Sequence, residues 1–298
     1  FRRDVVIDVA DFAWKSAGAD GRPERRPLGP VRIECVAQGG DRAIRVVRRA
    51  ADEGQDEVRI VRSADAAAAG GRFDVDATCT EPVPAAILAA VAPLAQLPLG
   101  PRALIRGQLT VTAAGGRQAG TAAGRFERVD LAACTGALAA GAAGTMDIDL
   151  VDATWRDGRL ESCEFTCAAG AGRIDRRLLE ALVATVGCRP GPAYVHAAVG
   201  READFEAFGC TVKIDGRGLD VVGSSRLGGA IAAEDGRSLV DPPAGIVSAE
   251  RIAWLLALPG AVYVPSSGPG GWLMSLLPAA GTPAERTSRA GERADRGF

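Results

Sequence analysis

The chain has 298 residues, of which 47% are hydrophobic and 24% are charged, and its formal net charge is −2. These proportions are typical of a globular protein and exclude wholesale disorder, a collagen-like rod and a small disulfide-rich scaffold. The near-neutral balance gives no overall basic field, so we expect no nucleic-acid partner. At about 150 residues per domain, the length allows one large domain or two ordinary ones.

Alternation of apolar and polar residues begins at the N-terminus and dominates the chain. The alternating segments are 4–9, 31–35, 58–60, 73–79, 108–112, 145–150 and 210–222. Such a period of two predicts strands with one buried and one solvated face. The pairs Gly-Gly at 115–116 and Asp-Gly at 157–158, 215–216 and 235–236 predict hairpin turns. Because the intervals are too short for crossover helices, the sheet is predicted to be antiparallel.

Three short amphipathic patterns predict helices at 84–94, 175–186 and 248–256. The first begins at a proline and the third at a serine, which are residues typical of helix N-termini. The segment 193–196, which contains the single histidine of the chain, His196, is predicted to be a strand.

The segment 169–175 imitates a GxGxxG dinucleotide fingerprint, but Asp175 replaces its third glycine. A carboxylate at a helix start accepts hydrogen bonds from the backbone and repels a pyrophosphate. We therefore interpret this segment as a helix cap and expect no nucleotide. The longest apolar stretches, 84–99 and 252–264, are interrupted by prolines and are shorter than the roughly 20 residues of a membrane span.

No motif predicts catalysis, a metal or a cofactor. The single histidine lacks a preceding GxSxG motif, so a Ser-His-Asp triad is not indicated. The seven cysteines form no CxxC pair, and most continue an alternating stripe, so we interpret them as small buried hydrophobic residues. Cys163 and Cys167 would lie about 13 Å apart along an extended strand, too far for a disulfide. We expect no enzymatic activity.

Composition divides the chain into three parts. Residues 1–70 are expected to form an N-terminal β segment, and residues 266–298 a low-complexity, disordered tail. Between them, residues 71–265 repeat a unit of strand, strand and short helix, which suggests a sheet extended by accretion.

Three segments of this repetitive region resemble the AsmA-like family, the superfamily that includes TamB. They are the run 107–112, the hairpin that leads from Gly144 through Asp157-Gly158 into the helix at 177–182, and the hairpin at 210–223. The resemblance covers residues 73–265. It implies an envelope protein of a double-membraned bacterium, with an N-terminal helix in the inner membrane and a β-rich body in the periplasm. Such a body conducts or shields lipids between membranes, or supports outer-membrane assembly together with envelope protein partners. The chain starts at Phe1 without such an anchor, so we expect that the anchor precedes this residue in the full-length protein.

We therefore predict a mostly β fold, an extended or curved antiparallel sheet with a hydrophobic groove-like face and two or three short α-helices. An apolar groove would hold phospholipid acyl chains, since each buried methylene contributes about 0.8 kcal/mol. The lining residues would be Leu109, Val111, Met146, Ile148, Leu150, Phe165, Val212 and Ile214. The same residues are equally compatible with an ordinary closed core.

Two other functions stay open. A periplasmic scaffold or secretion-system component would bind a protein partner through a sheet edge, and it predicts an exposed, uncharged edge strand. A carbohydrate-active enzyme would need a cleft with convergent carboxylates. Asp74, Asp76, Asp147 and Asp149 are the candidates, although alternation alone places such pairs on a solvated face.

Overall fold

The structure is a computed structural model, and it describes residues 4–17, 23–38, 40–49, 55–63, 71–87, 98–136, 140–197, 200–248 and 251. The predicted tail at 266–298 therefore lies outside the described residues. The same holds for most of the predicted helix at 248–256 and for the predicted helix at 84–94 beyond residue 87.

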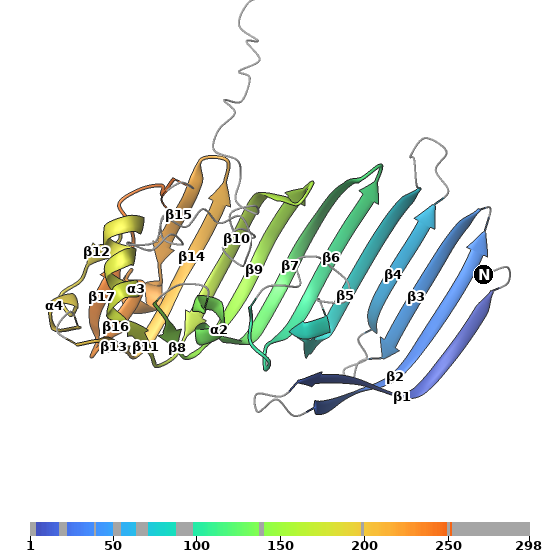
Figure 1. The fold of residues 1–298 in the computed structure, drawn as a ribbon, viewed down its shortest axis with the longest axis horizontal. Coiled ribbons are helices and arrows are strands. Elements are labelled where there is room, and N and C mark those ends of the chain that lie inside the picture. The colour runs from blue at the N-terminus through green and yellow to red at the C-terminus, as the bar shows by residue number, and fades with distance from the viewer. Residues whose placement is uncertain are drawn as a thin grey trace, which may run out of the picture.

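Most described residues are in β-strands (Figure 1). The first strands are β1 (Val5–Ala17), β2 (Pro23–Gln38), β3 (Asp41–Arg49), β4 (Gln55–Ser63), β5 (Arg72–Pro84), β6 (Leu104–Ala114) and β7 (Arg117–Asp130). They are followed by β8 (Ala142–Ala143), β9 (Thr145–Arg156), β10 (Arg159–Ala169), β11 (Gly172–Asp175), β12 (Arg189–Pro190), β13 (Glu202–Phe205), β14 (Ala207–Asp215), β15 (Gly218–Gly223), β16 (Ala232–Glu234) and β17 (Arg237–Asp241). The helical segments are η1 (Ala85–Ile87), α2 (Leu131–Thr135), α3 (Arg176–Ala181), its π-helical continuation η3 (Leu182–Val186), α4 (Tyr194–Ala197) and η4 (Ser225–Leu227).

One 14-stranded antiparallel sheet organises the molecule. Its order is β1-β2-β3-β4-β5-β6-β7-β9-β10-β14-β16-β17-β12, with β15 paired to β14 beside this path. The order follows the chain from β1 to β7, so each strand pairs with the next one. The strands β13, β11 and β8, in this order, form a second, three-stranded sheet. The predicted fold class, a mostly β fold with an extended or curved antiparallel sheet and a few short helices, is confirmed.

Short turns fix this register, as the sequence predicts. The Asp-Gly turns at 157–158 and 235–236 have positive φ at both residues (51° and 75°, 50° and 68°), the conformation that two-residue hairpins need. The hairpins β6–β7 and β16–β17 close at the predicted pairs 115–116 and 235–236. In β14–β15 the turn is shifted by one residue from the predicted pair 215–216, because Asp215 still pairs with Gly218 and the turn residues are Gly216 and Arg217. Each of the hairpins β6–β7 and β14–β15 is followed directly by a short helical segment, α2 and η4 respectively.

The helix predicted at 175–186 is present as α3 and η3. The Asp175 carboxylate accepts a hydrogen bond from the backbone N–H of Arg177 at 2.7 Å and caps α3. This confirms the helix-cap interpretation of the glycine-rich segment. The left-handed Gly187 (φ 85°) ends the helical segment.

The predicted strand at 193–196 is wrong, because these residues form α4 (Tyr194–Ala197). The N–H of Tyr194 donates to the carbonyl of Gly191 at 3.1 Å, so the backbone is already turning where the strand was expected. The preceding Gly191-Pro192 pair is a turn signal that outweighs an alternation of only four residues.

The hydrophobic core lies at one end of the sheet. Its fully buried centre is Leu179 of α3 with Leu239 and Val240 of β17, each at most 1% exposed. Figure 1 shows α3, α4 and the small sheet gathered at this end, whereas β1 to β7 extend away as a single layer. No helix among the described residues has the length and hydropathy needed to cross a membrane.

Candidate functional site

Cross-strand pairing brings apolar side chains into continuous rows across the sheet. One row runs Ile7, Ile33, Val46, Val58, Ala77, Leu109, Ala122, Ala153, Cys163, Ile214 and Leu219, each paired directly with the next. A parallel row runs Val5, Cys35, Ile44, Ile60, Val75, Val111, Gly120, Trp155 and Leu160. Because residues two apart on a strand share a face, both rows lie on the same face of the sheet.

The covering elements divide this face into two parts. The part over β9, β10, β14 and β15 contributes Cys167, Cys210 and Val212 to the core cluster, which also includes Leu178 and Leu179 of α3, Ile174 of β11 and Phe205 of β13. Ala153, Trp155 and Cys163 of the two rows are buried as well, but they do not belong to this cluster. Over β1 to β7, none of the side chains of the two rows belongs to that cluster. We call this second part the open apolar face, and its larger side chains are Ile7, Ile33, Ile44, Val46, Val58, Ile60, Val75, Leu109 and Val111.

Most side chains of the open apolar face are only half-buried, whereas Cys35 of the second row is 7% exposed. Exposure rises toward the edge strand, where Val5 is 40% and Ile7 is 48% exposed. Contiguous apolar surface of this kind marks sites of interaction with apolar ligands, membranes or other proteins.

The predicted groove residues all lie on the apolar face, but they fall into different parts of it. Leu109 and Val111 belong to the open apolar face. Val212 is a buried member of the core cluster, and Met146, Ile148, Phe165 and Ile214 pack against that cluster. Leu150 lies between the two parts and lines a depression beside Gly107 and Gly124.

Sequence reasoning missed the part of the open apolar face that lies N-terminal to residue 73. Ile33, Ile44, Val46, Val58 and Ile60 continue the rows of Leu109 and Val111 through β2 to β4. The same alternation of apolar and polar residues is present in these segments. The sequence does not show, however, that β2 to β6 pair in an unbroken order, and only that order joins the segments into one surface.

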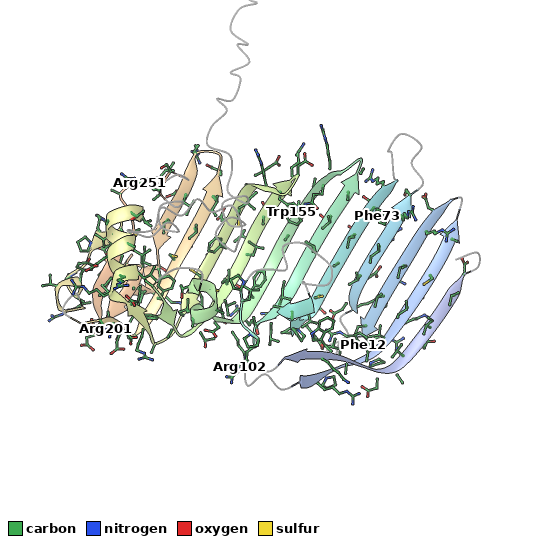
Figure 2. All side chains as sticks on the ribbon, viewed as in Figure 1. Phe12, Phe73, Arg102, Trp155, Arg201 and Arg251 are labelled. Atoms are coloured by element: carbon green, nitrogen blue, oxygen red, sulfur yellow. The ribbon has the colours of Figure 1, made fainter. Side chains whose placement is uncertain are left out.

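One rim of the open apolar face carries two arginines. Arg42 of β3 and Arg62 of β4 are directly paired, exposed, and in phase with the apolar residues of their strands. The Arg62 guanidinium lies over the ring of Phe73, 5.7 Å from its centroid. Phe73, which is labelled in Figure 2, is the second residue of β5. Neither arginine makes an ion pair with a described residue. Like charges directly opposite one another are unfavourable, so this rim is suited to an anion.

At the opposite rim, Arg48 and Asp56 form a buried ion pair. Asp56, 6% exposed, accepts hydrogen bonds from the N–H (2.6 Å) and hydroxyl (2.7 Å) of Thr80 and from Nε (2.8 Å) and a terminal nitrogen of Arg48. Burial alone raises the pKa of Asp56, but the bonds from Thr80 and Arg48 outweigh it and hold the pKa below its ordinary value of 3.8. Arg48 also lies 3.6 Å from a carboxylate oxygen of Glu81. We interpret this group of charges as structural, because its members compensate one another.

A line of backbone irregularities crosses the middle of the sheet. Gly107 and Gly124 are paired with positive φ (144° and 156°), and the register shifts beside them, between β7 and β9 and between β9 and β10. Bulges of this kind bend a sheet. An open depression of about 380 Å³ lies here, lined by both glycines, Cys79, Leu150 and Val151 together with Arg106, Arg125 and Asp149.

The opposite face of the sheet is polar. Asp74 accepts hydrogen bonds from Arg72 and from the Thr112 hydroxyl (2.8 Å each), and the bond from Arg72 is the main reason its pKa lies below the ordinary value. Asp147 accepts one from Arg125 at 2.9 Å.

The four candidate carboxylates of the enzyme hypothesis all lie on this polar face. Asp74 and Asp76 are on β5, whereas Asp147 and Asp149 are on β9, with β6 and β7 between them. The two pairs are therefore not brought together. The described residues hold no cluster of three or more His, Cys, Asp or Glu side chains with metal-binding geometry.

Comparison of the chain with protein-family models, with curated proteins and with solved structures finds no match. The resemblance to the AsmA-like family therefore stays a prediction from the sequence.

Proposed function

We propose that this chain is a non-enzymatic lipid-binding protein of the cell envelope that carries phospholipid between membranes or supports outer-membrane assembly. The observation that carries the proposal is the open apolar face, an uninterrupted apolar surface on a single sheet layer. In this proposal the chain acts in the periplasm, attached to the inner membrane in its full-length form, as the AsmA-like resemblance implies.

The dimensions of the open apolar face suit acyl chains. Seven strands, β1 to β7, are separated by six intervals of about 4.8 Å, so the face is roughly 29 Å long across the strands. This equals the thickness of the hydrocarbon core of a bilayer, about 30 Å, which is filled by two acyl chains end to end. Burial of methylenes on such a face contributes about 0.8 kcal/mol each and needs no polar recognition.

Charge on the open apolar face should abolish lipid binding. Ile60→Asp combined with Val111→Asp places two carboxylates in one row of the face, where bound acyl chains would have to desolvate them. Native mass spectrometry with lipid extraction should find phospholipid in a defined ratio on the unchanged protein. We expect at least about a tenfold loss in the variant.

The matched control is Gln108→Asp, on the same strand as Val111 but exposed on the polar face. It should keep its lipid, and circular dichroism should show native strand content for both variants. A folded double variant that retains its lipid, or an unchanged protein that carries none, would overturn the proposal. Ile148 and Phe165 are unsuitable for this test, because they pack against the core cluster.

The rim of the open apolar face that carries Arg42 and Arg62 should select anionic head groups. A phospholipid whose acyl chains lie on the open apolar face can place its phosphate between Arg42 and Arg62. Replacing both by glutamine should reduce the preference for fluorescent phosphatidylglycerol over phosphatidylcholine by about three- to tenfold in a binding titration. Arg59→Gln, an exposed arginine on the polar face of β4, is the control and should leave the preference unchanged. An unaltered preference in the double variant would contradict the role of the rim.

A second candidate function is favoured by the edge strand β1. It ends the strand order, and Val5, Val6 and Ile7 are 40%, 52% and 48% exposed. Val5 to Ile7 form an uncharged exposed stretch of this edge that is suited to strand addition by a protein partner, as in a periplasmic scaffold or secretion-system component. Farther along β1, the exposed residues Asp8, Asp11 and Lys15 are charged. A folded, lipid-free preparation in the first experiment would favour this function.

A further inference from the structure

Two buried cysteines contact one another between β10 and β14. Cys167 and Cys210 are directly paired across these strands, and their Sγ atoms lie 3.2 Å apart. They are 5% and 6% exposed, and both belong to the core cluster. Their separation in the chain is 43 residues, so the contact depends on the tertiary fold.

The backbone geometry of this pair suits a disulfide. Directly opposed residues of antiparallel strands have Cα atoms about 4.5 or 5.5 Å apart, and disulfides join Cα atoms about 4.4–6.8 Å apart. Rotation of the side chains alone would therefore bring the sulfurs to bonding distance. Cys163, the nearest cysteine on β10, pairs with Ala153 and Ile214 and has no cysteine opposite it.

We propose that Cys167 and Cys210 form a cross-strand disulfide when the chain folds in the presence of a disulfide donor, such as oxidised glutathione or an oxidised dithiol protein. The Cys167 thiolate attacks one sulfur of the donor, which forms a mixed disulfide and releases the first donor thiolate. Cys210 then attacks the Cys167 sulfur, the new Sγ–Sγ bond forms and the second donor thiolate leaves. The protein loses two electrons and two protons, and the donor is reduced to two thiols.

The electrostatics of the pair agree with this order of attack. A hydrogen bond from Cys210 stabilises the Cys167 thiolate and lowers the pKa of Cys167, although burial opposes it. The same contact, with burial, raises the pKa of Cys210. Because the thiolate is the reactive species, the lowered pKa favours Cys167 as the first nucleophile, and the disulfide formed is the same whichever thiol attacks first.

The disulfide would lock the layer that covers the core. The segment between the two cysteines contains β11, α3, η3, β12, α4 and β13, which include most of the elements packed against the covered part of the apolar face. A cross-link that closes this loop restricts the unfolded chain and stabilises the covered end. The proposal is independent of lipid binding, because it concerns the opposite end of the sheet from the open apolar face.

Refolding the full chain in a glutathione redox buffer at pH 8 tests the proposal. The expected product is 2 Da lighter and has five alkylatable thiols after denaturation instead of the seven of the reduced chain. Digestion with trypsin and a Glu-specific protease cuts after Glu164 and so separates Cys163 from Cys167. The expected cross-linked peptides are then 165–173 and 207–213. Seven free thiols in the folded, glutathione-treated protein, or a disulfide between other cysteines, would overturn the proposal.

Stability measurements with matched variants provide a second readout. Addition of dithiothreitol should lower the Tm of the oxidised chain and of Cys163→Ala by roughly 4 °C or more. The Tm of the double variant Cys167→Ala/Cys210→Ala should not respond to dithiothreitol. If that double variant does not fold, Cys210→Ala alone, which leaves a small side chain on the other strand, serves in its place. A Tm of the oxidised chain that is indifferent to dithiothreitol would contradict the proposal.

Discussion

Replacing Asp56 with alanine is expected to lower the free energy of unfolding by about 3–5 kcal/mol, the usual effect of breaking a buried ion pair from one side. The substitution leaves the Arg48 guanidinium, whose side chain is 11% exposed, without its main partner. It also removes the acceptor of both hydrogen bonds donated by Thr80. Urea unfolding followed by circular dichroism measures the change.

Two controls separate this effect from a general loss of negative charge. Asp76→Ala, at an exposed position on the polar face of β5, should change the unfolding free energy by less than about 0.5 kcal/mol. Asp56→Leu combined with Arg48→Met removes both charges, so much of the loss should be recovered. A double variant as unstable as Asp56→Ala, or a single variant within 1 kcal/mol of the unchanged protein, would be inconsistent with a buried pair.

The same pair should make stability depend on acid. The folded-state pKa of Asp56 lies below its ordinary value of 3.8, so the unfolded chain binds a proton there more readily than the folded one. The contribution of Asp56 is therefore fully present above about pH 5 and is lost as the pH falls through the ordinary value toward the folded-state pKa. The difference in unfolding free energy between the unchanged protein and Asp56→Asn should shrink over that range. A difference that stays constant down to pH 3 would contradict the lowered pKa.

The strands were predictable because their cause is local. A residue of one face recurs every second position, and Gly-Gly or Asp-Gly forms the turns of β6–β7 and β9–β10, so 108–112 and 145–150 could be assigned to β6 and β9 from sequence alone. Asp56 also carried a signal, since it is in phase with Val58 and Ile60 on an otherwise apolar stripe. Such a charge predicts a buried partner.

The covered and open parts of the apolar face could not be distinguished in the sequence. Val111 and Val212 occupy equivalent positions in alternating strands, yet Val212 is 8% exposed within the core cluster and Val111 is only half-buried. The two valines differ in exposure because of the position of α3 and β11, and these elements are not close in sequence to either strand. The contact of Cys167 with Cys210 escaped prediction for the same reason, because it depends on pairing between β10 and β14.

Replacing Gly124 with alanine is expected to lower the free energy of unfolding by at least about 2 kcal/mol. A Cβ atom there would lie 2.2 Å from the Arg106 carbonyl oxygen and 2.8 Å from the Cα of Gly107, and its φ of +156° is one that side chains rarely adopt. Backbone atoms of a paired strand have no rotamer to move into, so the two strands would have to separate at this point. Urea unfolding again measures the effect.

Two further glycines divide this effect into its parts. Gly116→Ala adds a Cβ at φ +77° with no atom within 4 Å, so it isolates the backbone strain, about 1–2 kcal/mol. Gly170→Ala has neither a positive φ nor a close atom and should change stability little. The expected order of loss is therefore Gly124, Gly116 and Gly170. If Gly124→Ala were no worse than Gly116→Ala, β6 and β7 would be able to move apart freely at the Gly107–Gly124 pair, and close backbone packing would not explain these glycines.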